Sequence, residues 1–276
     1  MPWLPEVFTA PVMEQILDKR RLDALLAVPY FDGLLAGDPD PLVESFADEP
    51  EVYVPVRGRV KGVAPFRAFV TETNAWLRQH NATVEDVEHV ILDRHGFEEV
   101  ILHLDSEDGA VRLPVAIVAD RRLDGRIDEL RVYFSNEPLT GRHANRPPVL
   151  QPDPGLDVPE VVAAYLRAVA AGDLDAIVAA FEPDGCVRES GSGRHVHRGP
   201  DGLRAFYGWL LSSGGMSLEA CALVDDGRVC ALEHVVRWGT GLPPQAAVAV
   251  FVRGESGRLA AVRVYDDTDP PLRPDA

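Results

Sequence analysis

Residues 30–46 read YFDGLLAGDPDPLVESF, and residues 165–181 read YLRAVAAGDLDAIVAAF. Both stretches fit the pattern Tyr-x5-Ala-Gly-Asp-x-Asp-x2-Val-x2-Phe, at an offset of 135 positions. Two further blocks repeat in the same order, with residues 62 and 67–69 matching 199 and 204–206, and residues 125–133 matching 257–265. Such a period is far longer than that of solenoid repeats, so each copy is expected to be a complete domain with its own core.

The composition is that of a globular protein with a strongly acidic surface. Hydrophobic residues make up 46% and charged residues 26% of the 276 residues, and the formal net charge is −17. Lys19 and Lys61 are the only lysines. An acidic surface repels phosphate backbones and anionic lipids, so neither nucleic acid nor a membrane is an expected partner.

The chain shows no pattern that indicates a metal, a cofactor or export. Cys186, Cys221 and Cys230 have no CxxC spacing, which argues against a disulfide framework or a zinc site. His195 and His197 lie two residues apart with no third ligand nearby, and no nucleotide-binding motif occurs. The N-terminus lacks the pattern of a signal peptide, and the apolar runs are short. We therefore expect a cytoplasmic protein without a cofactor.

In each copy, helical patterns come first and strand patterns follow. In copy 2 the strands are expected at about residues 217–224, 228–238, 245–253 and 258–266, with turns at residues 183–185, 225–227 and 254–257. This order predicts an α+β fold in which helices pack on a curved antiparallel sheet. The expected domains are residues 1–140 and 157–276, joined by a Pro-rich linker at residues 141–156.

Four stretches of copy 2 follow one another in the order AAYLRAVAAGDLDAIVAAF, CVRES, RGPDGLRAFYGWL and SGRLAAVRVYDD. In this series copy 2 resembles the cystatin-like cone fold of the nuclear-transport-factor-2-like superfamily, which includes ketosteroid isomerases and SnoaL-like polyketide cyclases. The resemblance implies two tandem cone domains, each with N-terminal helices packed on a curved sheet. It does not imply one activity, because the fold carries isomerases, cyclases, hydrolases and binding proteins.

Residue by residue, copy 2 is similar to ketosteroid isomerase at three positions. Tyr165 lies where that family has an oxyanion donor on the first helix, Glu189 where it has the catalytic carboxylate, and Tyr207 where a second tyrosine bonds the first. The family's second oxyanion donor, an aspartic acid on a late strand, has no counterpart within residues 246–250. Steroid isomerisation itself is therefore not expected.

Strand alternation adds two polar candidates. His234 shares a face with Leu232 and Val236, and Asp266 shares a face with Val264. A carboxylate buried against apolar walls becomes a useful base near neutral pH, and a tyrosine or imidazolium can hold an enolate oxygen. The candidate catalytic residues are Glu189, Tyr165, His234 and Asp266, and the candidate substrate-binding residues are Tyr207, Leu232, Val236, Trp238 and Phe251.

Copy 1 lacks most of these groups. Val54, Val70 and Phe134 occupy the positions of Glu189, Tyr207 and Asp266, while Tyr30 matches Tyr165 and the turn spacing aligns His103 with His234. We expect domain 1 to be catalytically degenerate and to pair with domain 2 through its sheet, as an intrachain pseudo-dimer that hides both apolar sheet faces. A homodimer of the whole chain is left open.

Three functions fit these observations. The first is a cofactor-independent isomerase or cyclase that acts on a hydrophobic polyketide- or terpenoid-like molecule. The second is an epoxide-opening polyether cyclase or epoxide hydrolase, because the lasalocid-type enzymes that the chain resembles are tandem copies of this fold with paired acids, here Glu189 and Asp266. The third is a non-catalytic binding or scaffold protein. The sequence does not identify the substrate.

Overall fold

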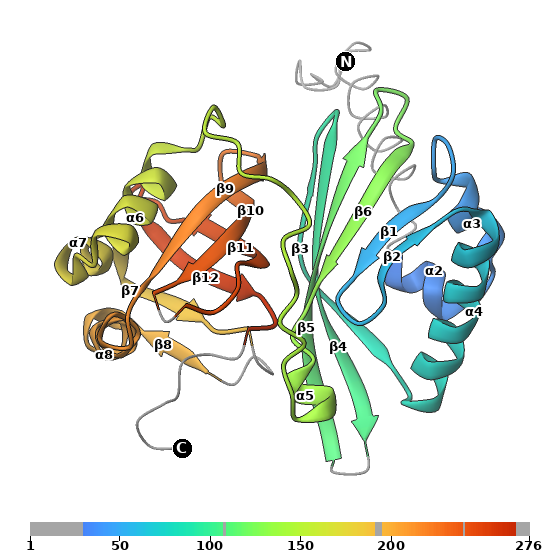
Figure 1. Cartoon of the computed structure of the whole chain (residues 1–276), viewed down its shortest axis with the longest axis horizontal. Helices are drawn as coiled ribbons and strands as arrows, with labels where there is room; N and C mark the ends of the chain where they lie inside the picture. Colours follow the sequence, from blue (N-terminus) through green and yellow to red (C-terminus); the bar gives the residue numbers. More distant parts are fainter. Residues whose placement is uncertain (1–29, 107–108, 191–194, 240, 269–276) are drawn as a thin grey trace, which may run out of the picture.

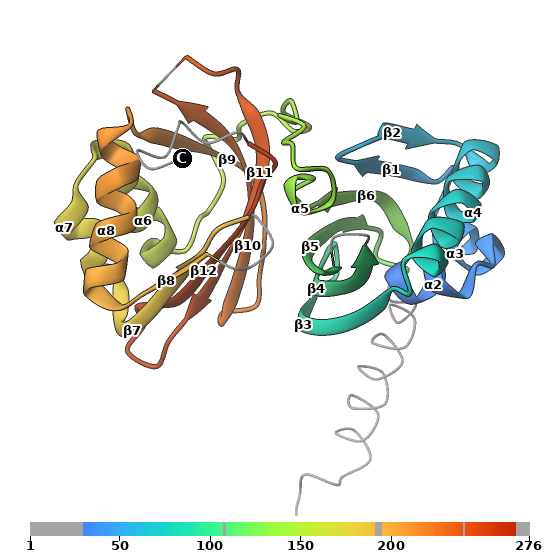
Figure 2. The same ribbon diagram turned by 90° about the horizontal axis from the view of Figure 1, so that it is seen from below.

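The computed structural model describes residues 30–106, 109–190, 195–239 and 241–268. These residues form two α+β units, domain 1 and domain 2, each with helices and one six-stranded sheet, which confirms the predicted fold class. The two sheets face each other, and the helices α2–α4 and α6–α8 lie on the outer sides (Figures 1 and 2). No helix in the described part of the chain is long and apolar enough to cross a membrane.

Domain 1 begins with two short helices and ends with a long hairpin and a final strand. Its elements are α2 (Tyr30–Ala36), α3 (Pro39–Glu44), β1 (Glu51–Val54), β2 (Gly58–Lys61), α4 (Val63–Gln79), β3 (Thr83–Ile91), β4 (His95–Ser106), β5 (Gly109–Arg121) and β6 (Ile127–Tyr133). The sheet order is β2-β1-β6-β5-β4-β3. A short helix, α5 (Glu137–Thr140), follows β6 and lies where the two domains meet (Figure 1).

Domain 2 repeats this plan. Its elements are α6 (Glu160–Ala171), α7 (Leu174–Ala179), β7 (Phe181–Arg188), β8 (Val196–Arg198), α8 (Gly199–Ser212), β9 (Met216–Asp225), β10 (Val229–Trp238), β11 (Gln245–Arg253) and β12 (Leu259–Tyr265). The sheet order is β8-β7-β12-β11-β10-β9, the same as in domain 1. Equal strand order in both halves agrees with a tandem duplication.

The sheets are mixed, whereas the sequence analysis expected antiparallel ones. β7 runs parallel to β12, and β1 runs parallel to β6. In each domain the last strand pairs with the first strand, which is distant in sequence. Because no hairpin turn joins these two strands, they are free to run parallel. The predicted turn at residues 183–185 falls inside β7, where pairing with β12 moves from Phe181 directly to Cys186. These residues therefore bulge out of the strand.

The repeated Gly-Asp pair joins two helices in each domain. Gly172 ends α6 with φ 66°, a left-handed conformation that glycine adopts without strain. Asp173 then caps α7 by accepting a hydrogen bond from the amide of Ala176. In domain 1, Gly37 has φ 76° and Asp38 caps α3 in the same way. The motif that revealed the duplication therefore sets the sharp turn at the start of each cone.

Each domain has its own core between helices and sheet, and a third cluster lies between the two sheets. The third cluster joins residues of domain 1, such as Phe97 and Val118, to residues of domain 2, such as Val229 and Val250. Burial of apolar surface from both sheets stabilises their association.

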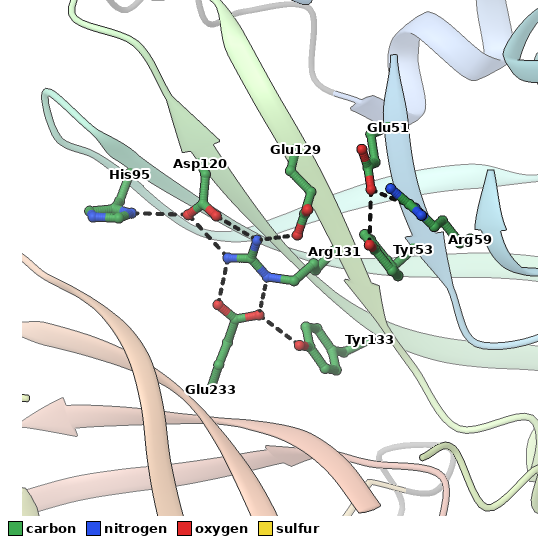
Figure 3. Close-up of polar contacts among 9 residues, drawn as sticks. All are labelled: Glu51, Tyr53, Arg59, His95, Asp120, Glu129, Arg131, Tyr133 and Glu233. Carbon is green, nitrogen blue, oxygen red and sulfur yellow. Dashed lines mark hydrogen bonds and ion pairs between the residues drawn. The ribbon is translucent and has the colours of Figure 1, made fainter. Parts of the chain in front are cut away.

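The contact between the sheets also buries charge. Arg131 on β6 is fully buried and bonds Glu233 on β10 through Nε, at 2.6 Å, and through a second nitrogen, at 2.8 Å. Asp120 and Glu129 also contact its guanidinium, and Tyr133 donates its hydroxyl to Glu233 (Figure 3). Burial alone would lower the pKa of Arg131, but the Glu233 and Asp120 carboxylates outweigh it and hold that pKa above its usual value.

A reciprocal cluster lies on the other side of the contact. Glu99 on β4 is fully buried and accepts hydrogen bonds from Arg263, at 2.6 Å, and from Tyr265. Arg188 approaches the same carboxylate at 3.4 Å. In the strand register Glu99 pairs with Ala116 on β5, and Glu233 pairs with Val248 on β11. The two glutamates therefore occupy equivalent strand positions. Each domain therefore offers a glutamate to an arginine–tyrosine pair of the other.

Candidate active site

Domain 2 contains a cavity of about 300 Å³ between its helices and the inner face of its sheet. Aromatic and aliphatic side chains form much of the wall, among them Phe206, Trp209, Leu210, Met216, Leu218 and Val262. Its size and apolar wall are typical of a small-molecule site.

The structure brings most of the predicted residues to this cavity. The wall includes Glu189, Tyr165, His234, Asp266, Tyr207, Val236 and Trp238. Leu232 and Phe251 do not line it, because both are completely buried in the core cluster of domain 2. Strand alternation therefore identified the correct face of the sheet but did not distinguish packed core from open cavity.

Tyr165 on α6 and Tyr207 on α8 form a buried pair at the cavity wall. Their hydroxyl groups lie 2.7 Å apart, and either can be the donor. Burial raises the pKa of Tyr165 to about 12 and that of Tyr207 well above its usual value. Both side chains are therefore protonated at neutral pH. The hydroxyl that accepts within the pair retains its own proton for a ligand.

Glu189 follows the last residue of β7 and forms a carboxylate–imidazole dyad with His197. Nε2 of His197 lies 2.7 Å from Oε1 of Glu189 and donates to it, because a carboxylate only accepts. The His197 ring stacks on Phe206 at a centroid distance of 4.5 Å. Glu189 lines the cavity and His197 does not. The imidazole therefore holds the carboxylate in place from behind.

His234 on β10 is buried, and burial lowers its pKa to about 4. Its Nδ1 donates to the carbonyl oxygen of Leu232 at 3.0 Å, which fixes the tautomer. The side chain is therefore a neutral imidazole at neutral pH. It cannot supply the imidazolium that the sequence analysis considered for enolate binding.

Asp266 and Asp267 directly follow β12 and lie in different surroundings. Asp266 lines the cavity, and burial raises its pKa above the usual value. Asp267 is 2% exposed, and hydrogen bonds from His143, Ala144 and Asn136 outweigh its burial and lower its pKa. Of the two neighbours, Asp266 is the carboxyl group that more readily retains a proton.

Several cavity residues were not recognised from the sequence. Glu137 lies at the end of the predicted domain 1 and His143 in the predicted linker, and Ser190, His195 and Thr268 also line the wall. No periodic pattern marks residues 135–145, so only the fold shows that this segment reaches the cavity of domain 2. Nε1 of Trp238 is buried without a hydrogen-bond partner in the described part of the protein.

Domain 1 carries apolar side chains at the equivalent strand positions. Val52 pairs with Leu130 as Val187 pairs with Val262, which aligns Val54 with Glu189, as predicted. The predicted match of His103 with His234 is wrong. Because Glu99 and Glu233 are equivalent, the counterpart of His234 is the completely buried Val100.

His103 lies three residues further along β4. Its side chain is exposed and bonds Glu85 on β3 at 2.7 Å. The error arose because the alignment matched Gly96 with Gly227. Gly227 lies in the turn before β10, whereas Gly96 lies within β4 and pairs with Ile91 and Ala119.

The elements, their order and the enclosed cavity define domain 2 as an α+β cone-fold domain. Residues 162–262 match the family model described as SnoaL-like domain, so this part of the chain is similar to that family. Members of that family are generally isomerases or cyclases. No match to a curated protein is found.

Several solved structures are similar to parts of the chain. SalBIII, an epoxide hydrolase/cyclase-like enzyme described in pyran ring formation in the polyether salinomycin, is 25% identical with a TM-score of 0.36, over 40% of this chain and 91% of that one. A protein of ketosteroid isomerase-like fold from Catenulispora acidiphila is 15% identical with a TM-score of 0.36, over 42% and 91%. An NTF2-like protein from Cytophaga hutchinsonii is 10% identical with a TM-score of 0.33, over 41% and 95%.

Proposed function

We propose that the protein is a cofactor-independent acid–base isomerase or cyclase that acts on a hydrophobic polyketide- or terpenoid-like molecule in secondary metabolism. One observation carries the proposal: two carboxyl groups, Glu189 and Asp266, line a largely apolar cavity that also presents a buried tyrosine pair. Acid–base chemistry on carbon needs a base and a proton donor at the same small molecule, and this cavity supplies both.

The two carboxyl groups would have different roles. Glu189, held by His197, would take a proton from the carbon beside a carbonyl group. Asp266, whose pKa is raised by burial, would return a proton or donate to the developing oxygen anion. Tyr165 would supply a further hydrogen bond to that oxygen from its position beside Tyr207.

The charge of the wall favours an uncharged substrate. The described lining contains the carboxyl groups of Glu137, Glu189 and Asp266 and no arginine or lysine. An anionic ligand would meet these carboxylates without a compensating cation. The cavity therefore suits a neutral ketone, enone or alcohol. In domain 1, the valines and the phenylalanine at equivalent positions support a degenerate, non-catalytic role for that domain.

The proposal is tested with Glu189→Gln. We expect the full-length protein to convert 3-cyclohexen-1-one to its conjugated isomer, followed by ultraviolet absorbance. The variant should lose at least about 100-fold in kcat/KM, because an amide cannot act as the base. Asp184→Asn, which changes an exposed carboxylate in β7, the strand that precedes Glu189, is the matched control. Equal activity of Glu189→Gln and the parent would refute the assignment.

The presence of a second acid in the cavity also favours an alternative, epoxide opening. Glu189 would take the proton of a substrate hydroxyl, and the hydroxyl oxygen would bond to an epoxide carbon. The epoxide C–O bond would break, and Asp266 would protonate the released oxygen. A simple epoxy alcohol, 4,5-epoxypentan-1-ol, tests this by chromatography of the cyclic ether.

The two probes separate the three functions. Turnover of the enone alone supports the isomerase, and cyclisation of the epoxy alcohol that Asp266→Asn abolishes supports the epoxide-opening enzyme. Binding of both probes without turnover of either would support the third function, a non-catalytic binding protein.

A further inference from the structure

The segment that leaves domain 1 is bound to domain 2 at Asp267. Asp267 accepts hydrogen bonds from the Ser135 hydroxyl at 3.1 Å, from the Asn136 amide at 2.8 Å and from the Ala144 amide at 2.8 Å. Its backbone carbonyl accepts a further bond from the amide of Asn145, at 2.8 Å. Asp267 thus ties together both ends of residues 135–145 and fixes the path of this segment over domain 2.

The same carboxylate orients His143. Nδ1 of His143 lies 3.3 Å from Oδ1 of Asp267 and 3.4 Å from the hydroxyl of Ser135. Because a carboxylate only accepts hydrogen bonds, Nδ1 carries the proton in this pair. The His143 imidazole lines the cavity, whereas Asp267 does not.

This pair is the inverse of the other dyad at the cavity. In the Glu189–His197 pair the carboxylate lines the wall and the imidazole lies behind it. In the Asp267–His143 pair the imidazole lines the wall and the carboxylate lies behind it. An imidazole that a buried carboxylate orients is the usual arrangement of a histidine that works on a substrate. Asp266, the neighbour of Asp267, lines the same cavity.

We propose that His143 is a substrate-contacting residue of the domain 2 site, supplied by the segment that leaves domain 1 and positioned by Asp267. The proposal rests on the proposed function of the cavity and names a residue outside the stretch 162–262 that matches the SnoaL-like domain. With the proton on Nδ1 and directed to Asp267, Nε2 contacts the ligand as an acceptor, in a hydrogen bond donated by a substrate hydroxyl.

The inference is tested by ligand binding, so that it does not depend on turnover. The probe is 2-naphthol, a planar neutral enol, titrated into the full-length protein by calorimetry. His143→Ala should weaken binding about tenfold, the effect of one lost hydrogen bond in a closed site. Arg142→Ala changes an exposed neighbour whose side chain forms no hydrogen bond or ion pair with the described residues; it is the matched control and should bind like the parent.

A second measurement distinguishes a direct contact between His143 and the ligand from a purely structural role of His143. With 15N-labelled histidine, His143 should show the Nδ1-protonated pattern in the parent, shift on addition of 2-naphthol, and lose that pattern in Asp267→Ala. Added imidazole should restore part of the activity of His143→Ala on any substrate that the parent turns over, which a purely structural role would not allow.

The outcomes distinguish this inference from the proposed function. Unchanged 2-naphthol affinity in His143→Ala, together with lost turnover in Glu189→Gln, would overturn only the role of His143. Failure of 2-naphthol to bind the parent protein would count against both, because the cavity would then not accept a neutral planar molecule.

Discussion

His234 shows how burial decides what a polar residue can do. The imidazole is enclosed in the cone, its pKa is lowered to about 4, and its Nδ1 is committed to Leu232. The side chain can accept a hydrogen bond from a substrate through Nε2, but it cannot offer a positive charge at neutral pH. Stabilisation of an oxygen anion would therefore come from the tyrosine pair and from Asp266.

The buried imidazole should make stability depend on pH. An unfolded histidine binds a proton below a pKa of 6.5, whereas folded His234 does so only below about 4. Between these values the unfolded state binds more protons, so stability falls as the pH falls from about 6.5 to about 4. The loss attributable to this residue is about 3 kcal/mol.

Urea unfolding of the parent and of His234→Gln at pH 7.5 and pH 4.5 checks this expectation. The difference in unfolding free energy between the two pH values should be smaller in the variant, while other titrating groups contribute equally to both proteins. The same pH dependence in both proteins would show that His234 does not resist protonation.

At the level of elements, the repeated Gly-Asp turn offers a matched comparison between domains. Both Gly37 and Gly172 have positive φ, so alanine is strained at either position. At Gly172 a Cβ atom would meet Leu211 at an ordinary 3.8 Å. At Gly37 it would lie 2.8 Å from the side chain of Asn74, which donates hydrogen bonds to the Leu34 and Leu35 carbonyls.

Gly37→Ala should therefore destabilise the protein more than Gly172→Ala does. The Gly172 variant should lose roughly 1–2 kcal/mol from backbone strain alone. The Gly37 variant should lose more, because Asn74 must also move away from the carbonyls at the end of α2. Thermal unfolding of both variants tests this order, and a larger loss for Gly172→Ala would contradict it.

The sequence predicted these elements well because each depends on short-range patterns. The expected strand at residues 245–253 coincides with β11, and the strand expected at 217–224 lies within β9. The failures concern long-range relations: the pairing partner of β7, the register that displaced His103, and the approach of His143 to a cavity in the other domain. Local periodicity carries no information on which distant segments become neighbours.

At the scale of the whole molecule, the contact between domains is more polar than the apolar faces expected from the sequence. Two buried glutamates lie within it, and each is matched by arginine and tyrosine from the opposite sheet; Figure 3 shows the cluster of Glu233. The two clusters differ in the number of carboxylates that contact the arginine side chains. Arg131 contacts Asp120 and Glu129 besides Glu233, whereas among the described residues Arg188 and Arg263 form salt bridges only with Glu99.

Glu99→Gln should therefore cost more stability than Glu233→Gln. Loss of Glu99 leaves two largely buried arginines without a carboxylate, a change that typically costs about 3–5 kcal/mol. Loss of Glu233 leaves Arg131 with two carboxylates and should cost less. Scanning calorimetry measures both losses, and Glu99→Gln should also separate the unfolding of the two domains. A greater loss for Glu233→Gln would show that the additional carboxylates do not compensate.

The alternation of side chains along the strands couples the two faces of the domain 2 sheet. Arg188, Glu233 and Tyr265 contact domain 1, and the next residue in each case, Glu189, His234 or Asp266, lines the cavity. Substitutions in domain 1 should therefore be tolerated at the positions equivalent to the domain 2 cavity residues, but not at the surface that contacts domain 2. A domain 1 without catalytic groups would therefore still be retained, because the domain 2 sheet packs against it and this contact holds the cavity residues of domain 2 in place.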